Sequence, residues 1–214
     1  MSIRILVVDN QAMVRRGLIM FLQTDPDLEI VGEASNGREA IEMALDRQPD
    51  LVLMDLLMPE MDGVLATRMI RQQQPDLPII ALSSSTDYAL IGTAVLAGAS
   101  TYLHKGNKPN QLIAHIKALV AGRVILSPAV MGHVLMHLPA PDALEEPLTP
   151  DEISLLRLLA AGHSDDEIAQ QLQQDISTVA ASMRQISSKL SSSTRLLALL
   201  RAMQLGLVER PTPA

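Results

Sequence analysis

The chain has 214 residues, of which 48% are hydrophobic, so it is long enough for one large domain or two ordinary ones. It contains no cysteine and only three aromatic residues. This composition excludes disulfides, thiolate zinc sites and recognition of single-stranded nucleic acid by stacked aromatic rings. A formal net charge of −7 is not typical of a protein that binds DNA phosphates. Without a long apolar segment, we expect a soluble, cytoplasmic protein with no membrane association.

Residues 1 to about 121 alternate between short apolar runs and helical patterns. The apolar runs predict five strands, at Ile3–Val8, Glu29–Ala34, Leu51–Met54, Pro78–Leu82 and Thr101–Leu103. Apolar residues three and four positions apart predict helices between and after them, at Gln11–Gln23, Gly37–Arg47, Val64–Gln73, Tyr88–Ala97 and Asn110–Ala121. Strands that alternate with helices indicate an α/β fold. We expect a doubly wound, five-stranded parallel sheet of the flavodoxin-like type.

The rest of the chain has a different pattern. Prolines and acidic residues predict a linker at 123–147, with a short helix from Ala129 to His137. From 148 to 210 the pattern is helical throughout, and two N-terminal capping signals, at Thr149 and Ser164, mark helix starts. We therefore expect a domain at 1–122, the linker, and a small all-α domain of four helices in helix-turn-helix arrangement.

Four polar side chains stand where the predicted strands of the first domain end. They are Asp9, Asp55, Ser83 and Lys105. The carboxyl ends of parallel strands meet at one edge of the sheet, so these side chains are expected to converge there. Carboxylates at this edge suit Mg²⁺, and a hydroxyl and an ammonium suit phosphoryl oxygens.

Five features occur in order across residues 1 to about 121. Four stretches carry them: Ile5-Leu-Val-Val-Asp9-Asn10, Asp55-Leu-Leu-Met-Pro-Glu-Met-Asp62-Gly63, Ala81-Leu-Ser83 and Gly98-Ala-Ser-Thr-Tyr-Leu-His-Lys105. With these stretches the chain resembles the receiver domain of two-component response regulators. The resemblance implies that Asp55 accepts a phosphoryl group from a sensor histidine kinase and that Lys105 and Ser83 bind this group.

The same resemblance implies a metal and a switch. Mg²⁺ is held by Asp9, Asp55, the carbonyl of Leu57 and the position of Asn10, while Tyr102 turns inward when Ser83 moves toward the phosphate. Asn10 departs from the family, which usually has a second acid there. Because Mg²⁺ prefers carboxylates, we expect weaker Mg²⁺ binding and slower phosphorylation than in a three-carboxylate pocket.

The second domain has caps and apolar residues at characteristic positions. They are Leu148-Thr-Pro150-Asp-Glu152, Leu155-Leu-Arg-Leu-Leu-Ala-Ala-Gly162, Ser164, Glu167-Ile-Ala169, Leu172, Ile176, Thr178-Val179, Ile186, Lys189-Leu190 and Leu205-Gly-Leu-Val208. In these positions the domain resembles the LuxR-type helix-turn-helix of NarL/FixJ-type regulators. The resemblance implies promoter binding through a recognition helix and a homodimer on activation.

Charge in the second domain argues against strong DNA contact. Ala180, Ala181 and Ser182 replace residues that usually contact DNA, and Asp165 and Asp166 replace an Asn-Lys pair. Residues 148–214 hold six basic and seven acidic side chains, a net charge of −1. The side chains left for DNA contact are Ser177, Thr178, Arg184 and Lys189.

Two functions remain open at this point. One is a phosphorylation-controlled transcription regulator, and the other is a phospho-gated interaction protein whose helix-turn-helix binds a protein partner. Neither is an enzyme beyond the receiver's own phosphoryl transfer and slow dephosphorylation. The apolar last helix, with Leu196 and Leu197, is either buried in the domain or a dimer or partner interface.

Overall fold

The computed structural model of the chain describes residues 2–85, 87–125, 127–139, 144 and 146–209. These residues form two compact units, 1–116 and 117–214, and each is considered by itself. Among the described residues, no helix has the length and apolar character needed to cross a membrane.

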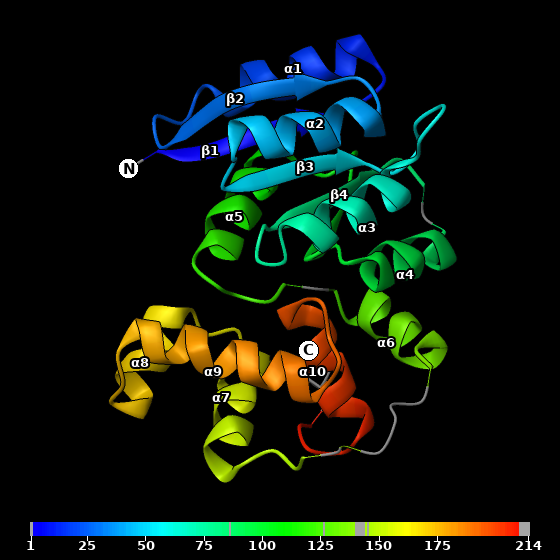
Figure 1. Cartoon of the computed structure of the whole chain (residues 1–214). Coiled ribbons are helices and arrows are strands. Elements are labelled where there is room, and N and C mark those ends of the chain that lie inside the picture. Colours follow the sequence, from blue (N-terminus) through cyan, green and yellow to red (C-terminus); the bar gives the residue numbers. More distant parts are fainter. Residues whose placement is uncertain (1, 86, 126, 140–143, 145, 210–214) are drawn as a thin grey trace. The chain divides into compact units, whose positions relative to one another are not determined.

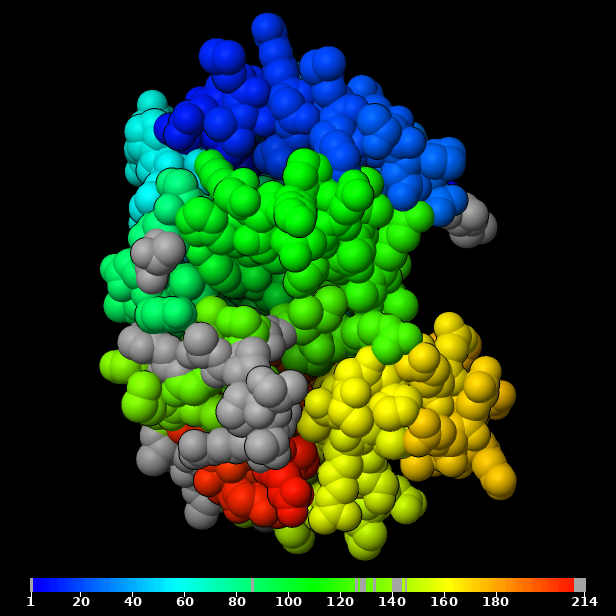
Figure 2. Space-filling model, turned by 180° about the vertical axis from the view of Figure 1, so that it is seen from behind, coloured from blue at the N-terminus to red at the C-terminus, as the bar shows by residue number. Residues whose placement is uncertain are grey.

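The first unit is a five-stranded parallel sheet with helices on both faces (Figure 1). The strand order is β2-β1-β3-β4-β5. The helices α2, α3 and α4 lie on one face, and α1 and α5 lie on the other (Figure 1 and Figure 2). This arrangement confirms the predicted doubly wound fold. The elements are β1 (Ile3–Val8), α1 (Ala12–Leu22), β2 (Leu28–Ala34), α2 (Gly37–Arg47), β3 (Leu51–Asp55), α3 (Gly63–Gln73), β4 (Ile79–Ser83), α4 (Tyr88–Ala97), β5 (Thr101–His104) and α5 (Pro109–Val120).

The core of this unit is aliphatic. Strands β3 and β4 are buried along their whole length, and side chains of α2 and α3 pack on them. A strand covered on both faces can be apolar throughout, which explains why these runs do not alternate with polar residues. The rigid core fixes where each strand ends.

Strand register places the ends of four strands at one edge. In parallel pairing Val8 lies opposite Met54, Asp55 opposite Leu82, and Ser83 opposite His104. The residues at or just after these pairs are the polar side chains singled out in the sequence. A one-residue slip would turn them to the wrong face, so the buried core also sets the register.

The second unit is helical. Its helices are α6 (Pro128–His137), α7 (Pro150–Ala160), α8 (Asp165–Leu172), α9 (Ile176–Lys189) and α10 (Arg195–Gln204). Complete capping boxes begin α7 and α8, where Thr149 pairs with Glu152 and Ser164 with Glu167. Helices α7 to α10 confirm the predicted helix-turn-helix domain.

Helix α10 is buried inside this unit. Leu196, Leu197 and the apolar residues that follow them are at most 4% exposed. Part of the cover comes from α6, and the Gln204 side-chain amide lies within hydrogen-bond distance of the carbonyls of Leu135 and Leu138. Of the two alternatives for the last helix, the structure has the buried one.

A buried cation ties three parts of the first unit together. The Arg71 guanidinium, on α3, donates to the Gly98 carbonyl between α4 and β5 at 2.9 Å and to the carbonyls of Gln74 and Pro75 after α3. Burial lowers the pKa of Arg71 to about 10, against a smaller opposing effect of Asp76. The guanidinium therefore satisfies carbonyl groups that the turns leave without a helical partner.

We predict that Arg71→Met destabilises the protein by about 2–4 kcal/mol, because buried carbonyls lose their donor. The measurement is urea unfolding followed by circular dichroism. Arg68→Met is the matched control, since Arg68 lies on the same helix but is exposed. Equal unfolding midpoints for the two variants would contradict the proposed role of Arg71.

Candidate functional site

One ammonium group joins two buried carboxylates at the carboxyl edge of the sheet. The Lys105 Nζ lies 2.6 Å from the Asp9 Oδ2 and 2.8 Å from the Asp55 Oδ2. The side chains of Asp9 and Asp55 are 0% and 2% exposed, and that of Lys105 is 15% exposed. Two carboxylates this close and this dry repel each other, and the lysine offsets that repulsion.

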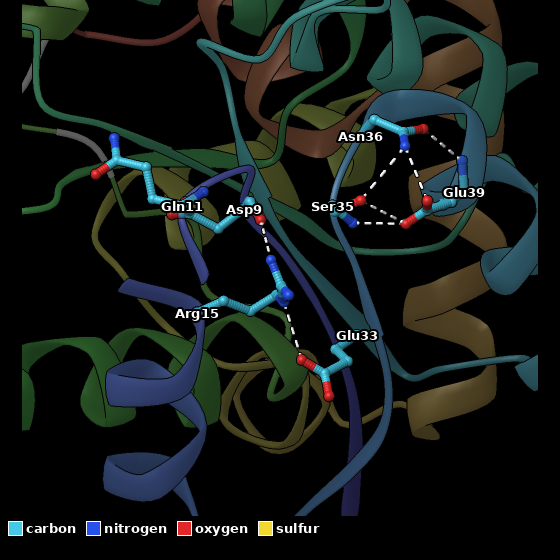
Figure 3. Close-up of polar contacts among 7 residues, drawn as sticks. All are labelled: Asp9, Gln11, Arg15, Glu33, Ser35, Asn36 and Glu39. Atoms are coloured by element: carbon cyan, nitrogen blue, oxygen red, sulfur yellow. Dashed lines mark hydrogen bonds and ion pairs between the residues drawn. The ribbon is translucent and has the colours of Figure 1, made fainter. Parts of the chain in front are cut away.

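The Asp9 carboxylate is held in place by its own loop. Its Oδ1 accepts the backbone N–H of Gln11 at 2.8 Å. The Arg15 guanidinium donates to the Asp9 carbonyl at 2.7 Å and pairs with Glu33 at 2.9 Å, which ties the loop to α1 and β2 (Figure 3). Arg15 was not identified from the sequence, because its partners come from two separate elements.

The loop after Asp55 is shaped by two glycines. A Cβ on Gly63 would stand 2.0 Å from the Asp55 carbonyl oxygen, so only glycine allows α3 to start this close to β3. A Cβ on Gly37 would stand 2.8 Å from the carbonyl oxygen of Met61, in the same loop. Asp62 caps α3 by accepting the Leu65 N–H at 2.7 Å.

Gly37 begins α2, which is capped by a compact polar network. The Asn36 Oδ1 accepts the Glu39 N–H at 3.0 Å, and Glu39 accepts the Ser35 N–H at 2.8 Å (Figure 3). The hydrogen bonds from Ser35 lower the pKa of Glu39. The start of α2 therefore packs against the loop after Asp55, where the Gly37 N–H donates to the Met61 carbonyl at 3.3 Å.

Burial changes the acid–base behaviour of Asp55. Loss of water raises its pKa above the ordinary value, and the hydrogen bond and charge of Lys105 oppose this rise. The charge of Asp9 raises the pKa further, and the Leu57 N–H, 3.3 Å from the Asp55 Oδ1, lowers it. Ionised Asp55 is therefore weakly solvated, which favours a partner that brings positive charge or accepts the carboxylate covalently.

Ser83 and Tyr102 meet on the loop between β4 and α4. Ser83 is fully buried, and its Oγ accepts the Ser85 N–H at 3.0 Å. The Tyr102 hydroxyl donates to the Ser85 carbonyl at 2.8 Å, and its ring packs beside Leu56 and Ala81. Burial, with a smaller effect of Tyr88, raises the pKa of Tyr102, so the hydroxyl stays a donor. The structure thus brings the two predicted switch residues to one short segment.

The oxygen groups beside Asp55 fit a hard cation. The Oδ2 atoms of Asp9 and Asp55 are buried, and among the described residues the Lys105 ammonium is the group that contacts both of them. The Asn10 amide, on the exposed loop, and the Leu57 carbonyl supply uncharged oxygens nearby in the chain. Among the described residues, no three Asp, Glu, His or Cys side chains are grouped so that they could hold a metal ion by themselves.

The residues predicted to contact DNA divide into two sets. Ser177, Thr178 and Arg184 are exposed on α9. Lys189 instead lies 3.0 Å from Glu146 and 3.1 Å from Glu152, and these partners raise its pKa. Its charge is therefore already balanced within the unit.

Asp165 has partners that the sequence did not indicate. The Arg195 guanidinium donates to its Oδ2 at 2.9 Å and to the Gly122 carbonyl at 3.2 Å. The Asp165 N–H donates to the Ala121 carbonyl at 3.0 Å. Asp166, by contrast, is exposed. Asp165 thus holds the segment before α6 against the start of α8, and Asp166 is the acid that faces solvent.

Comparison with known proteins matches each of the two units to a known family. Residues 5–117 match the response regulator receiver domain, and residues 146–201 match the bacterial regulatory proteins of the luxR family. The chain belongs to the response regulators. Receiver and LuxR-type helix-turn-helix together make it a regulator of transcription rather than an enzyme.

Individual relatives extend over nearly the whole chain. The chain is 40% identical to the transcriptional regulatory protein LiaR of Bacillus subtilis over 196 residues, 90% of this chain and 93% of that protein. It is 35% identical to the response regulator protein VraR of Staphylococcus aureus over 209 residues, 98% of this chain and 100% of that protein. These relatives favour transcription control over the alternative of a protein-interaction module.

Solved structures agree on the fold. A LuxR-family two-component response regulator from Aurantimonas matches with a TM-score of 0.59 at 33% identity, over 64% of this chain and 97% of that one. The response regulator ChrA of a heme-sensing two-component system matches with a TM-score of 0.53 at 31% identity, over 96% and 98% of the two chains.

We predict that Asp55→Asn raises the free energy of unfolding at pH 7 when Mg²⁺ is absent. A raised folded-state pKa means that the ionised carboxylate costs stability above that pKa, and the cost vanishes as pH falls below the ordinary aspartate range. Urea unfolding at pH 7 and at about pH 3.5 measures this difference. A variant less stable than wild type at pH 7 would contradict the expected sign.

Proposed function

We propose that Asp55 accepts a phosphoryl group from the phosphohistidine of a sensor histidine kinase, and that this modification controls promoter binding by the helix-turn-helix domain. The observation that carries the proposal is the contact of Lys105 with both Asp9 and Asp55 at aligned strand ends. A carboxylate beside a fixed ammonium in a dry crevice is a nucleophile with a ready-made site for a phosphoryl dianion.

The transfer is a direct displacement at phosphorus. An Asp55 carboxylate oxygen forms the new bond as the bond between phosphorus and the kinase imidazole breaks, and the electron pair leaves on the imidazole nitrogen. Lys105 and Ser83 bind the phosphoryl oxygens. Attack by water on the resulting acyl phosphate returns phosphate and free Asp55, which gives slow dephosphorylation by the same site.

Mg²⁺ fits this site as the cofactor. Asp9, Asp55, the Leu57 carbonyl and Asn10 would hold it, and it supplies positive charge to the phosphoryl oxygens when bound. The protein's own contribution is to orient the Asp55 carboxylate and to keep Lys105 close to the oxygens. Because Asn10 brings no charge, two carboxylates, Asp9 and Asp55, would hold the ion.

The switch acts through the segment after β4. When the Ser83 hydroxyl turns toward the phosphoryl group, it gives up the Ser85 N–H that it now accepts. The Ser85 carbonyl also accepts the Tyr102 hydroxyl. When Ser85 is displaced, this hydrogen bond is lost and the Tyr102 ring is free to turn inward. The two arrangements of this segment are the two states whose populations phosphorylation shifts.

The output is promoter binding by a homodimer formed on activation. Exposed Ser177, Thr178 and Arg184 on α9 make the contacts. Lys189 contributes little, because its charge is paired. With so few phosphate contacts per copy, binding has a shallow dependence on salt and needs two copies to reach useful affinity.

We predict a shift of specific promoter fragments in a gel at low salt with phosphorylated wild type, and none with Asp55→Ala treated in the same way. Arg184→Ala lowers the affinity for the fragment about tenfold, since one contact of about 1.4 kcal/mol is lost. Arg157→Ala is the matched control, because Arg157 is exposed on α7 outside the recognition helix. A phosphorylated protein that selects no genomic fragment would overturn promoter binding and favour a protein partner.

We predict that Asn10→Asp binds Mg²⁺ five- to thirtyfold more tightly, because a further carboxylate near the ion adds about 1–2 kcal/mol. Calorimetric titration is the suitable measurement, since the chain has no tryptophan to report binding. Asn110→Asp makes the same substitution at an exposed position at the start of α5 and controls for net charge. Equal affinities for wild type and Asn10→Asp would remove the argument about position 10.

A further inference from the structure

A histidine ring connects the two loops that carry Ser83 and Lys105. The His104 Nδ1 lies 3.0 Å from the Gly106 backbone nitrogen and accepts its N–H. The His104 Nε2 lies 3.0 Å from the Ser84 carbonyl oxygen. Because Nδ1 is an acceptor, the proton of the neutral ring is on Nε2, which donates to Ser84.

We propose that His104 is a positioning residue for phosphoryl transfer, an inference that rests on the proposed phosphorylation of Asp55. Ser84 directly follows Ser83, and Gly106 directly follows Lys105. By bonding to both neighbours, the neutral ring sets the spacing between the hydroxyl and the ammonium that bind the phosphoryl group.

The ring works together with Tyr102. Both side chains stand on the same face of β5, two residues apart, and they hold the consecutive carbonyls of Ser84 and Ser85. The strands themselves are joined here by the Lys105 N–H, which donates to the Ser83 carbonyl at 2.8 Å. After this bond β4 ends, and the side chains of Tyr102 and His104 hold the segment that follows it through their hydrogen bonds.

Gly106 is fitted to this contact. A Cβ at position 106 would lie 2.9 Å from the His104 Nδ1 and 3.0 Å from its Cε1. A side chain at 106 would therefore push the ring away from the backbone N–H. The glycine allows the close approach that the hydrogen bond requires.

Protonation of His104 would break one of the two bonds. With a proton on each nitrogen, Nδ1–H would point at the Gly106 N–H, and two donors cannot bond to each other. His104 also borders a groove lined by apolar side chains of α1 and α5, including Val14, Leu18 and Leu112, and Lys105 is the charged residue among the described lining residues.

Two charged groups on the loops that the ring joins have partners of their own. Lys105 is held by Asp9 and Asp55, and Asp87 on the segment after β4 caps α4 by accepting the Ala89 N–H at 2.9 Å. None of these described groups is hydrogen-bonded to the ring. The bridge needs a neutral ring, so protonation of His104 should weaken it.

The test measures initial rates of phosphorylation by acetyl phosphate with saturating Mg²⁺, from pH 8 to pH 5.5, on the full chain. His104→Leu removes the bridge, whereas His104→Gln keeps one donor and one acceptor without a titrating group. His115→Gln is the matched control, because the hydrogen bond that the structure describes for His115 is to the Gln111 carbonyl of its own helix, α5. Asp55→Ala defines the background.

At pH 8 we expect His104→Leu to react about tenfold more slowly than wild type and His104→Gln to stay within about twofold. Toward pH 5.5 the rate of wild type should fall further than that of His104→Gln. Protonation of Asp55 slows every variant. The ratio of the wild-type rate to the His104→Gln rate therefore reports the effect of protonating the histidine alone. His115→Gln should follow wild type throughout.

Two results would overturn the inference while leaving the proposed function intact. The first is a phosphorylation rate for His104→Leu that equals the wild-type rate at every pH. The second is a ratio of the wild-type rate to the His104→Gln rate that does not change with pH. If wild type acquired no more phosphate than Asp55→Ala, the proposed phosphorylation would fail, and the role of His104 would fail with it.

Discussion

The ion-pair contact of Lys105 with Asp9 and Asp55 is the interaction on which the rest of the site depends. Two carboxylates without water would repel each other, and the ammonium between them offsets this repulsion and holds them close. The sheet makes this possible, because its buried strands bring three distant parts of the chain to one edge. In the proposed function, this ammonium and these carboxylates form the site for the phosphoryl group, whose charge is opposite to that of the lysine.

The segments next to this contact are held by few hydrogen bonds. Ser83 and Lys105 stand at the ends of neighbouring strands, and the side chains of Tyr102 and His104 hydrogen-bond to the segments that follow them. A phosphoryl group that attracts the Ser83 hydroxyl therefore competes with a small number of identifiable hydrogen bonds. A segment held by so few hydrogen bonds can rearrange while the strands below it stay in place, as the proposed switch requires.

Much of the fold followed from local patterns. Apolar runs, helical periods and the capping signals at Thr149 and Ser164 predicted the elements, because these depend on neighbouring residues. Partners that come from distant elements could not be predicted in this way. Asp165 was expected to repel DNA, yet its charge is held by Arg195, and Lys189, expected to contact DNA, is held by two glutamates. His104 and Arg15 were passed over for the same reason, since their roles exist only after the loops are brought together.

The central claim is that Asp55 is the residue that carries the phosphoryl group, and the most direct measurement is the chemical location of that group. The protein is treated with acetyl phosphate and Mg²⁺, the acyl phosphate is trapped by borohydride reduction, and peptides are sequenced by mass spectrometry. The account predicts that the reduced residue is Asp55 and that no other aspartate is modified. Label on Asp9 or on another carboxylate, with Asp55 unmodified, would contradict it.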